Sequence, residues 1–216
     1  MTKLEINQGG KKQSYHLPLS WSEVSIKQYQ ELMMLIDNEK NELDTKIRTI
    51  SILTGCELSL LSKASVANLN KVYKKLGELT AKLPSKTFRR VIEIEGVEYG
   101  FIPDMNDLTF GEFVDIDTWL QSGYANLIDI LTVLYRPVLK RKGERYNIAE
   151  YEASSRVERA KVFSRSMSVD SVYGAMVFFY TIASKHIETT LYSLEMQKKK
   201  RSSTEQREKK KTVKAP

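Results

Sequence analysis

Apolar residues recur with helical spacing through most of the first half of the chain. They fall every three or four positions after Ser25, over residues 42–54 and again after Ser65, which predicts three helices. Ser25 and Gln28 have the spacing of a capping box, and Gly55 supplies a C-terminal stop for the second helix.

Two segments instead alternate polar and apolar residues with a period of two. The first lies near residues 3–17 and contains two adjacent glycines, and the second lies near residues 90–102 and turns at Glu95-Gly96. Alternation on both sides of a glycine turn is typical of a β-hairpin. We therefore predict two short hairpins.

The second half returns to helical patterns. Thr109 and Glu112 form a second capping box, and the helix that follows carries apolar residues at Phe113, Ile116, Trp119 and Leu120. The next segment, 124–135, is apolar nearly all round, which predicts a helix buried at the centre of the fold.

Charged and polar residues interrupt the pattern after Pro137. Residues 140–145 predict a basic loop, and helix starts are expected at Asn147 with Glu150 and at Ser155 with Glu158. Ser168 is expected to cap the last long helix, whose apolar stripe continues to about residue 196. The fold class we predict is mainly α (α+β), a helical bundle-like domain with about seven or eight helices and two short β-hairpins.

The net charge of the chain is concentrated at its C-terminal end. From Gln197 onward nine basic residues face two glutamates, and this net charge of +7 equals that of all 216 residues. Val213 is the only sizeable apolar residue there, too little to offset the conformational entropy lost on ordering. We expect residues 1–196 to form one neutral domain and residues 197–216 to form a disordered, flexible basic tail.

The tail is the strongest candidate binding segment. Clustered Lys and Arg attract nucleic-acid phosphates without reading sequence, and they also attract anionic lipid surfaces or acidic protein patches. A solvated end without a partner is the alternative. The candidate residues for nucleic-acid or acidic-partner contact are Lys198, Lys199, Lys200, Arg201, Arg207, Lys209, Lys210, Lys211 and Lys214.

Catalytic and cofactor-binding patterns are absent from the sequence. His16 and His186 have no second histidine or cysteine at metal-ligand spacing, and phosphate-loop and nucleophile-turn motifs do not occur. The acids Asp104, Asp107, Asp115 and Asp117 lack the spacing of a cation loop and are interpreted as helix-start charges. We assign no catalytic, cofactor or metal residue, predict that the protein is not an enzyme, and expect no small-molecule substrate.

Other features limit the compartment and suggest partners. Cys56 is the only cysteine, which favours a reducing compartment, and no apolar stretch is long enough to predict a membrane span. Large apolar residues exceed what one helix stripe requires, so an oligomer or a partner surface is expected from a set spread over three helices. These residues are Tyr29, Met33, Met34, Trp119, Phe178, Phe179 and Tyr180.

Several short segments together resemble a family of small proteins from tailed bacteriophages of Bacteroides-like hosts, including crAss-like phages. The resemblance covers roughly residues 18 to 185. Its signatures are Trp21-Ser22-Glu23-Val24-Ser25-Ile26-Lys27-Gln28-Tyr29, Gly100-Phe101-Ile102-Pro103, Leu131-Thr132-Val133-Leu134-Tyr135-Arg136-Pro137, Tyr146-Asn147-Ile148, and Met167-Ser168 through Gly174-Ala175 to Phe178-Phe179.

This resemblance implies a virion structure or assembly protein of the tail or head–tail module, in the virion or the host bacterial cytoplasm. The partners implied are other virion proteins, including copies of the chain itself in an oligomer or ring. The basic tail at residues 197–216 is not part of the resemblance, and non-specific contact with packaged DNA is expected from its charge. A structural subunit and a tail-assembly chaperone both fit. The alternative function is a nucleic-acid-binding accessory protein that uses the basic tail. An enzyme would require several of the acids and His16 to converge in a deep pocket.

Overall fold

A computed structural model describes residues 3–8, 11–38 and 41–182 of the chain. The chain divides into two compact units, Met1–Ala175 and Met176–Pro216. In the second unit the described residues, 176–182, are helical, and the Phe179 and Tyr180 rings meet edge to face at 5.6 Å. The architecture below is that of the first unit.

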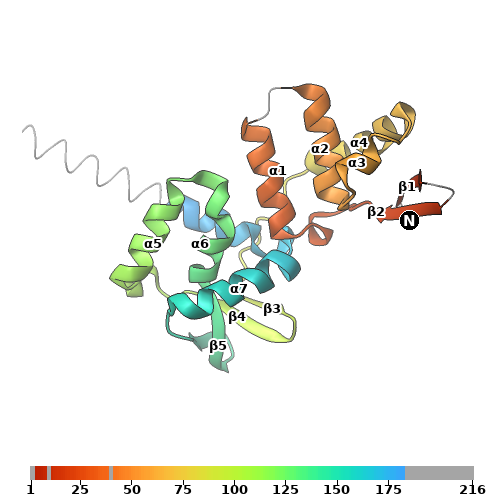
Figure 1. The fold of residues 1–216 in the computed structure, drawn as a ribbon. Helices are drawn as coiled ribbons and strands as arrows, with labels where there is room; N and C mark the ends of the chain where they lie inside the picture. The colour runs from red at the N-terminus through yellow and green to blue at the C-terminus, as the bar shows by residue number, and fades with distance from the viewer. Residues whose placement is uncertain (1–2, 9–10, 39–40, 183–216) are drawn as a thin grey trace, which may run out of the picture. The chain divides into compact units, whose positions relative to one another are not determined.

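The first unit is mainly helical and carries two small antiparallel sheets (Figure 1). This confirms the predicted fold class. Its α-helices are α1 (Ile26–Asn38), α2 (Glu42–Thr54), α3 (Leu58–Leu61), α4 (Val66–Thr80), α5 (Phe110–Leu120), α6 (Leu127–Leu134) and α7 (Ala153–Ser166), and residues 169–175 are helical as well. Short 3-10 helices are η1 (Trp21–Glu23), η2 (Met105–Asp107) and η3 (Gly123–Asn126).

The predicted helix boundaries in the first half are confirmed by their caps. The Ser25 N–H donates to Gln28 Oε1 at 2.9 Å and the Gln28 N–H donates to Ser25 Oγ at 3.2 Å, which completes that capping box. Gly55 ends α2 with φ of 69°, a left-handed conformation that suits glycine. The Ser65 side chain caps α4.

The strands form one isolated hairpin and one four-stranded sheet. Strands β1 (Lys3–Gln8) and β2 (Lys11–His16) pair with each other. The larger sheet has the order β3-β4-β5-β6, all neighbours antiparallel, with strands β3 (Val91–Ile94), β4 (Val97–Phe101), β5 (Tyr135–Lys142) and β6 (Arg145–Ile148). Both predicted hairpins are therefore present, and β5–β6 is a third.

The third hairpin corrects the interpretation of residues 140–148. These residues are not a loop followed by a helix start at Asn147, because Lys142 pairs with Arg145 and Lys140 with Asn147. Gly143 makes the tight turn possible with φ of 61°. The period of two was hidden because the strand is charged on both faces, so it shows no alternation of apolar and polar residues.

Two other helix boundaries also differ from expectation. The segment 124–135 begins as η3, continues as α6 and ends at Leu134, because Tyr135 already pairs with Phe101 in the sheet. Helix α7 begins at Ala153 instead of following a cap at Ser155.

The core lies where α6 and α7 meet the larger sheet (Figure 1). The Tyr99 ring lies 5.0 Å from that of Phe163, and the Phe101 ring lies 5.3 Å from that of Tyr135, all edge to face. Such pairs add about 0.5–1.5 kcal/mol each beyond the area they bury. The expectation that α6 is central holds, because its side chains from Leu127 and from Ile130 to Leu134 are buried.

Candidate interaction surfaces

The candidate residues of the basic tail lie outside the described residues. This applies to Lys198, Lys199, Lys200, Arg201, Arg207, Lys209, Lys210, Lys211 and Lys214, and to the predicted boundary at residue 197. The prediction of a flexible, anion-binding tail therefore stays a prediction.

The four aspartates singled out in the sequence do not form one site. The Asp104 side chain caps η2 by accepting the Asn106 N–H at 2.9 Å. Asp115 accepts a hydrogen bond from the Tyr151 hydroxyl, and the Asp107 and Asp117 side chains are exposed. Asp104 thus acts at a helix start, as the sequence suggested.

The remaining candidate groups also have local partners. His16, the last residue of β2, has its Nε2 atom 2.7 Å from Oε2 of Glu23 in η1. Cys56 is buried, and burial raises the pKa of its thiol, an effect that Tyr15 partly opposes. Within residues 3–182, apart from the gaps, no three His, Cys, Asp or Glu side chains gather where they could hold a metal ion.

A basic surface lies on the β5–β6 hairpin. In the antiparallel register Lys140 is opposite Asn147 and Lys142 is opposite Arg145, so these side chains share one face of the hairpin. Lys140, Lys142 and Arg145 are exposed, and no ion pair to any of them occurs in the described part of the chain. We call Lys140, Arg141, Lys142 and Arg145 the basic hairpin.

The opposite face of this hairpin packs against residues of β4. The Tyr146 ring packs on Gly100, where an added Cβ would lie 2.5 Å from the ring, and the Tyr146 hydroxyl donates to the Phe101 carbonyl at 2.7 Å. Arg141 Nη1 lies 2.5 Å from Glu98 Oε1 on β4. A glycine is therefore needed at position 100 for Tyr146 of the hairpin to pack against β4.

Two further arginines flank the basic hairpin where the chain enters β3. The carbonyl of Arg89 accepts the Tyr135 hydroxyl at 2.6 Å, and the carbonyl of Arg90 accepts the Tyr146 hydroxyl at 3.2 Å. Burial raises the pKa of both tyrosines, so both hydroxyls remain donors at neutral pH. These hydrogen bonds fix the backbone, and both arginine side chains are exposed.

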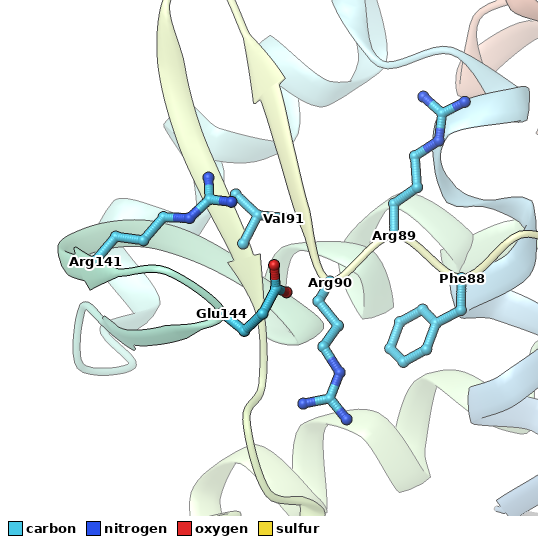
Figure 2. A pocket seen from close by; sticks show the side chains of 6 residues that line it. All are labelled: Phe88, Arg89, Arg90, Val91, Arg141 and Glu144. Atoms are coloured by element: carbon cyan, nitrogen blue, oxygen red, sulfur yellow. The ribbon is translucent and has the colours of Figure 1, made fainter.

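A shallow hollow of about 370 Å³ lies between these arginines and the hairpin (Figure 2). It is lined by Phe88, Arg89, Arg90, Val91, Arg141 and Glu144. The Arg89 and Arg90 guanidinium groups point to opposite sides, while Arg141 extends toward Val91 and the Glu144 carboxylate lies between Arg141 and Arg90. Because the three guanidinium groups diverge, the hollow does not form a pocket for one small anion. The arrangement suits an extended acidic surface.

An apolar surface lies on the outer side of α5. Phe110 is 82% exposed, Phe113 is 56% exposed and Val114 is 41% exposed. With the exposed Asp117 they occupy positions i, i+3, i+4 and i+7, which form one stripe along a helix. We call Phe110, Phe113, Val114 and Asp117 the α5 face. A cluster of exposed aromatic and aliphatic side chains is typical of a protein-binding surface.

The inner side of α5 is held by an ion pair. Glu112 is 1% exposed and Arg136 is 8% exposed, and Arg136 Nη1 lies 2.8 Å from Glu112 Oε1. The second Glu112 oxygen accepts the Thr109 N–H at 2.6 Å and so completes the predicted capping box. Burial lowers the pKa of the Arg136 guanidinium, and the Glu112 carboxylate opposes this shift.

Two more contacts fix the C-terminal half of α5. The Tyr151 hydroxyl donates to Asp115, and the Arg156 guanidinium stacks 4.7 Å from the centre of the Trp119 ring. Burial, followed by the Asp115 hydrogen bond, raises the pKa of Tyr151 to about 12. Because these polar contacts occupy the inner side, the apolar side chains at 110, 113 and 114 remain on the outside.

Sequence reasoning pointed to a different set of exposed apolar residues. Of that set, Tyr29 is buried between aromatic rings and Trp119 is half-buried under Arg156, whereas Met34 is 38% exposed and Phe178 is 39% exposed. The capping box offered a signal that was missed, because it fixes the phase of α5. With Glu112 turned back toward Thr109 and Ile116 one turn further on, the positions 110, 113 and 114 fall on the other side.

Comparison with known proteins identifies no relative, since no family, curated protein or solved structure matches this chain. Among the described helices, none combines the length and apolar character needed to cross a bilayer. The two surfaces therefore have to be interpreted from their own chemistry.

Proposed function

We propose that this chain is a non-catalytic morphogenesis protein of a tailed bacteriophage that acts through protein–protein contacts. It serves either as a structural subunit of the tail or head–tail region or as a tail-assembly chaperone. The α5 face carries this proposal, because two exposed phenylalanines on a rigidly anchored helix are suited to dock another protein. The sequence signatures described above supply the phage assignment.

Energetic considerations support a binding role for the α5 face. Exposing an aromatic side chain forgoes about 25 cal/mol for each Å² of apolar surface left in water. A partner that covers Phe110 and Phe113 recovers that free energy, and aromatic side chains are enriched among the residues that dominate binding. The buried Glu112–Arg136 pair fixes the helix before binding, so little ordering cost remains.

Peptide mass spectrometry of purified phage particles tests this proposal. The chain is expected in particles at a fixed ratio to the major capsid protein, as for a ring subunit, or in a complex with one virion protein before assembly, as for a chaperone. Replacing both aromatic residues (Phe110→Ser with Phe113→Ser) is expected to deplete the chain from either species. A protein absent from particles and from virion-protein complexes contradicts the proposal.

A matched control separates the α5 face from exposed apolar residues in general. Val66 is 73% exposed and Leu83 is 69% exposed, both far along the chain from α5. Val66→Ser with Leu83→Ser removes similar apolar character and is expected to leave incorporation unchanged.

The basic hairpin supports a second candidate, a nucleic-acid-binding accessory protein. Lys140, Lys142 and Arg145 share one exposed face, as a contact to successive phosphates requires. This function predicts that affinity for duplex DNA falls steeply with salt, and that deleting residues 197–216 abolishes binding. Lys140→Gln with Lys142→Gln should then lower the salt slope by about 2 in fluorescence anisotropy. Unchanged affinity in both variants would exclude this candidate.

A further inference from the structure

The two surfaces of the first unit carry opposite charge. Residues 103–121, which include η2 and α5, contain no basic side chain and five acidic ones. Asp104, Asp107 and Asp117 are exposed, whereas Glu112 and Asp115 face inward to Arg136 and Tyr151. Residues 140–145 contain four basic side chains and only Glu144 as an acid, and Arg89 and Arg90 lie beside them. The acidic surface is therefore suited to a basic partner, and the basic surface to an acidic one.

Contacts within the described part of the chain leave several of these charges unpaired. Asp107 and Asp117 on the acidic side, and Lys140, Lys142 and Arg145 on the basic side, form no ion pair with any described residue. Among the described residues, Glu112 is the one acid of residues 103–121 that forms an ion pair, and its partner Arg136 lies outside residues 140–145.

Exposed apolar residues accompany the charge on both surfaces. The α5 face presents Phe110 and Phe113, and the β5 strand presents Leu139, which is 66% exposed beside the bulge between Val138 and Lys140. Charge complementarity selects a partner and its orientation, whereas apolar contact supplies most of the affinity. Both ingredients are present on each side.

We propose that the α5 face of one copy, together with the neighbouring Asp107, binds the basic hairpin of a second copy in a head-to-tail contact. This inference rests on the proposed function and names its partner as another copy of the chain. Because the two faces differ, every bound copy still offers one unused face of each kind. Such heterologous contacts continue into a closed ring or an open filament.

A nucleic acid is a poorer occupant of the same surfaces. It would cover the basic hairpin, but it would leave the α5 face unoccupied, and the acidic segment 103–121 would repel its phosphates. A second copy satisfies both surfaces at once. The contact is expected to weaken as salt rises, since exposed charges are screened within about 10 Å at 0.1 M.

A charge-swap experiment on the full chain tests this contact by sedimentation velocity at low salt. The first variant reverses the acidic side (Asp107→Lys with Asp117→Lys), and the second reverses the basic side (Lys140→Glu with Lys142→Glu). The wild-type protein is expected to sediment as an oligomer, and each variant alone should associate at least tenfold more weakly because its contact joins like charges.

The equimolar mixture of the two variants gives the decisive result. Each contact between the two different variants again joins opposite charges, so oligomers in which they alternate are expected to appear. Lys74→Glu with Lys75→Glu makes the same charge change on exposed side chains of α4 and should behave as wild type. Circular dichroism of every variant establishes that it is folded.

Three outcomes overturn the inference. They are a monomeric wild-type protein, variants that associate as wild type does, and a mixture that fails to restore association. A chain that is monomeric in solution yet present in particles at a fixed ratio would overturn this contact and leave the proposed function intact. A chain that forms head-to-tail oligomers yet is absent from particles and from virion-protein complexes would overturn the proposed function and leave this contact intact. If the wild-type protein is monomeric and only the basic-side variant loses DNA binding, the basic hairpin binds nucleic acid, and the head-to-tail contact is overturned.

Discussion

Helices α5 and α6 are neighbours in the chain and in space, yet they use their apolar residues in opposite ways. Helix α6 buries Leu127 and every side chain from Ile130 to Leu134, whereas α5 buries only Glu112 and Ile116 and exposes two phenylalanines. Polar contacts hold α5 and apolar contacts hold α6. The difference shows that α6 contributes to the core, and it supports the proposal that the outer side of α5 binds a partner.

Breaking the ion pair that holds α5 should have the largest effect. Arg136→Met leaves the Glu112 carboxylate buried without its cation, which is expected to lower the free energy of unfolding by about 3–5 kcal/mol. The double variant Arg136→Met with Glu112→Leu removes both charges and should recover most of that loss. Urea denaturation measures both values. A double variant as unstable as the single one would show that the pair is not the anchor.

Truncating one apolar residue on each helix compares them directly. Ile130→Ala on α6 opens a cavity in the core and should cost about 2–5 kcal/mol. Phe113→Ala on α5 removes a larger side chain but should change stability by less than about 0.5 kcal/mol, because that side chain is exposed. Thermal unfolding followed by circular dichroism checks both. Equal losses would mean that Phe113 contributes to the core.

Two glycine substitutions compare the packed face of the β5–β6 hairpin with the exposed side of α5. Gly100→Ala places a methyl group 2.5 Å from the Tyr146 ring and 2.9 Å from Ile148, which should cost about 1–3 kcal/mol. Gly111→Ala meets no atom within 4 Å and should stabilise α5 by up to about 1 kcal/mol. Chemical denaturation of the two variants should therefore give changes of opposite sign.

Alkaline pH should release the contact between Tyr151 and Asp115, with the smallest effect. The folded-state pKa of Tyr151 is raised from 10.0 to about 12, so its protonated form is favoured in the folded protein. Its contribution to stability is complete below pH 10 and is lost as the pH rises through about 12. Tyr151→Phe should flatten the stability profile between pH 10 and 12. An unchanged profile would show that Tyr151 ionises equally in both states.

Local signals in the sequence predicted the starts of α1, α2, α4 and α5 and two of the hairpins because they act over a few residues. Ser25, Gly55 and Thr109 perform the capping roles expected of them, and Ser65 caps the helix that was predicted to begin after it. The β5–β6 hairpin was missed because β5 is charged on both faces, β6 is only four residues long, and the hairpin is fixed by distant partners, Gly100 and Glu98. Contacts with partners so distant in the chain cannot be detected from local periodicity.

The candidate surfaces were predicted only in part. The charge of residues 140–145 was evident, but the face shared by Lys140, Lys142 and Arg145 depends on a strand register that composition cannot supply. The α5 face depends on which side of the helix meets Arg136, a residue more than twenty positions away. Burial is decided by such contacts, so an apolar residue count alone cannot tell which large apolar residues are exposed.

Photo-cross-linking from position 113 during infection tests the central claim most directly. Benzoylphenylalanine in place of Phe113 should yield a covalent product with one defined protein, while the same group in place of the exposed Val66 on α4 should yield none. A product with residues 138–148 of another copy would support both the docking role of the α5 face and the head-to-tail contact. A product with a different virion protein would support the docking role alone. No specific product from position 113 would contradict the claim that the α5 face binds protein.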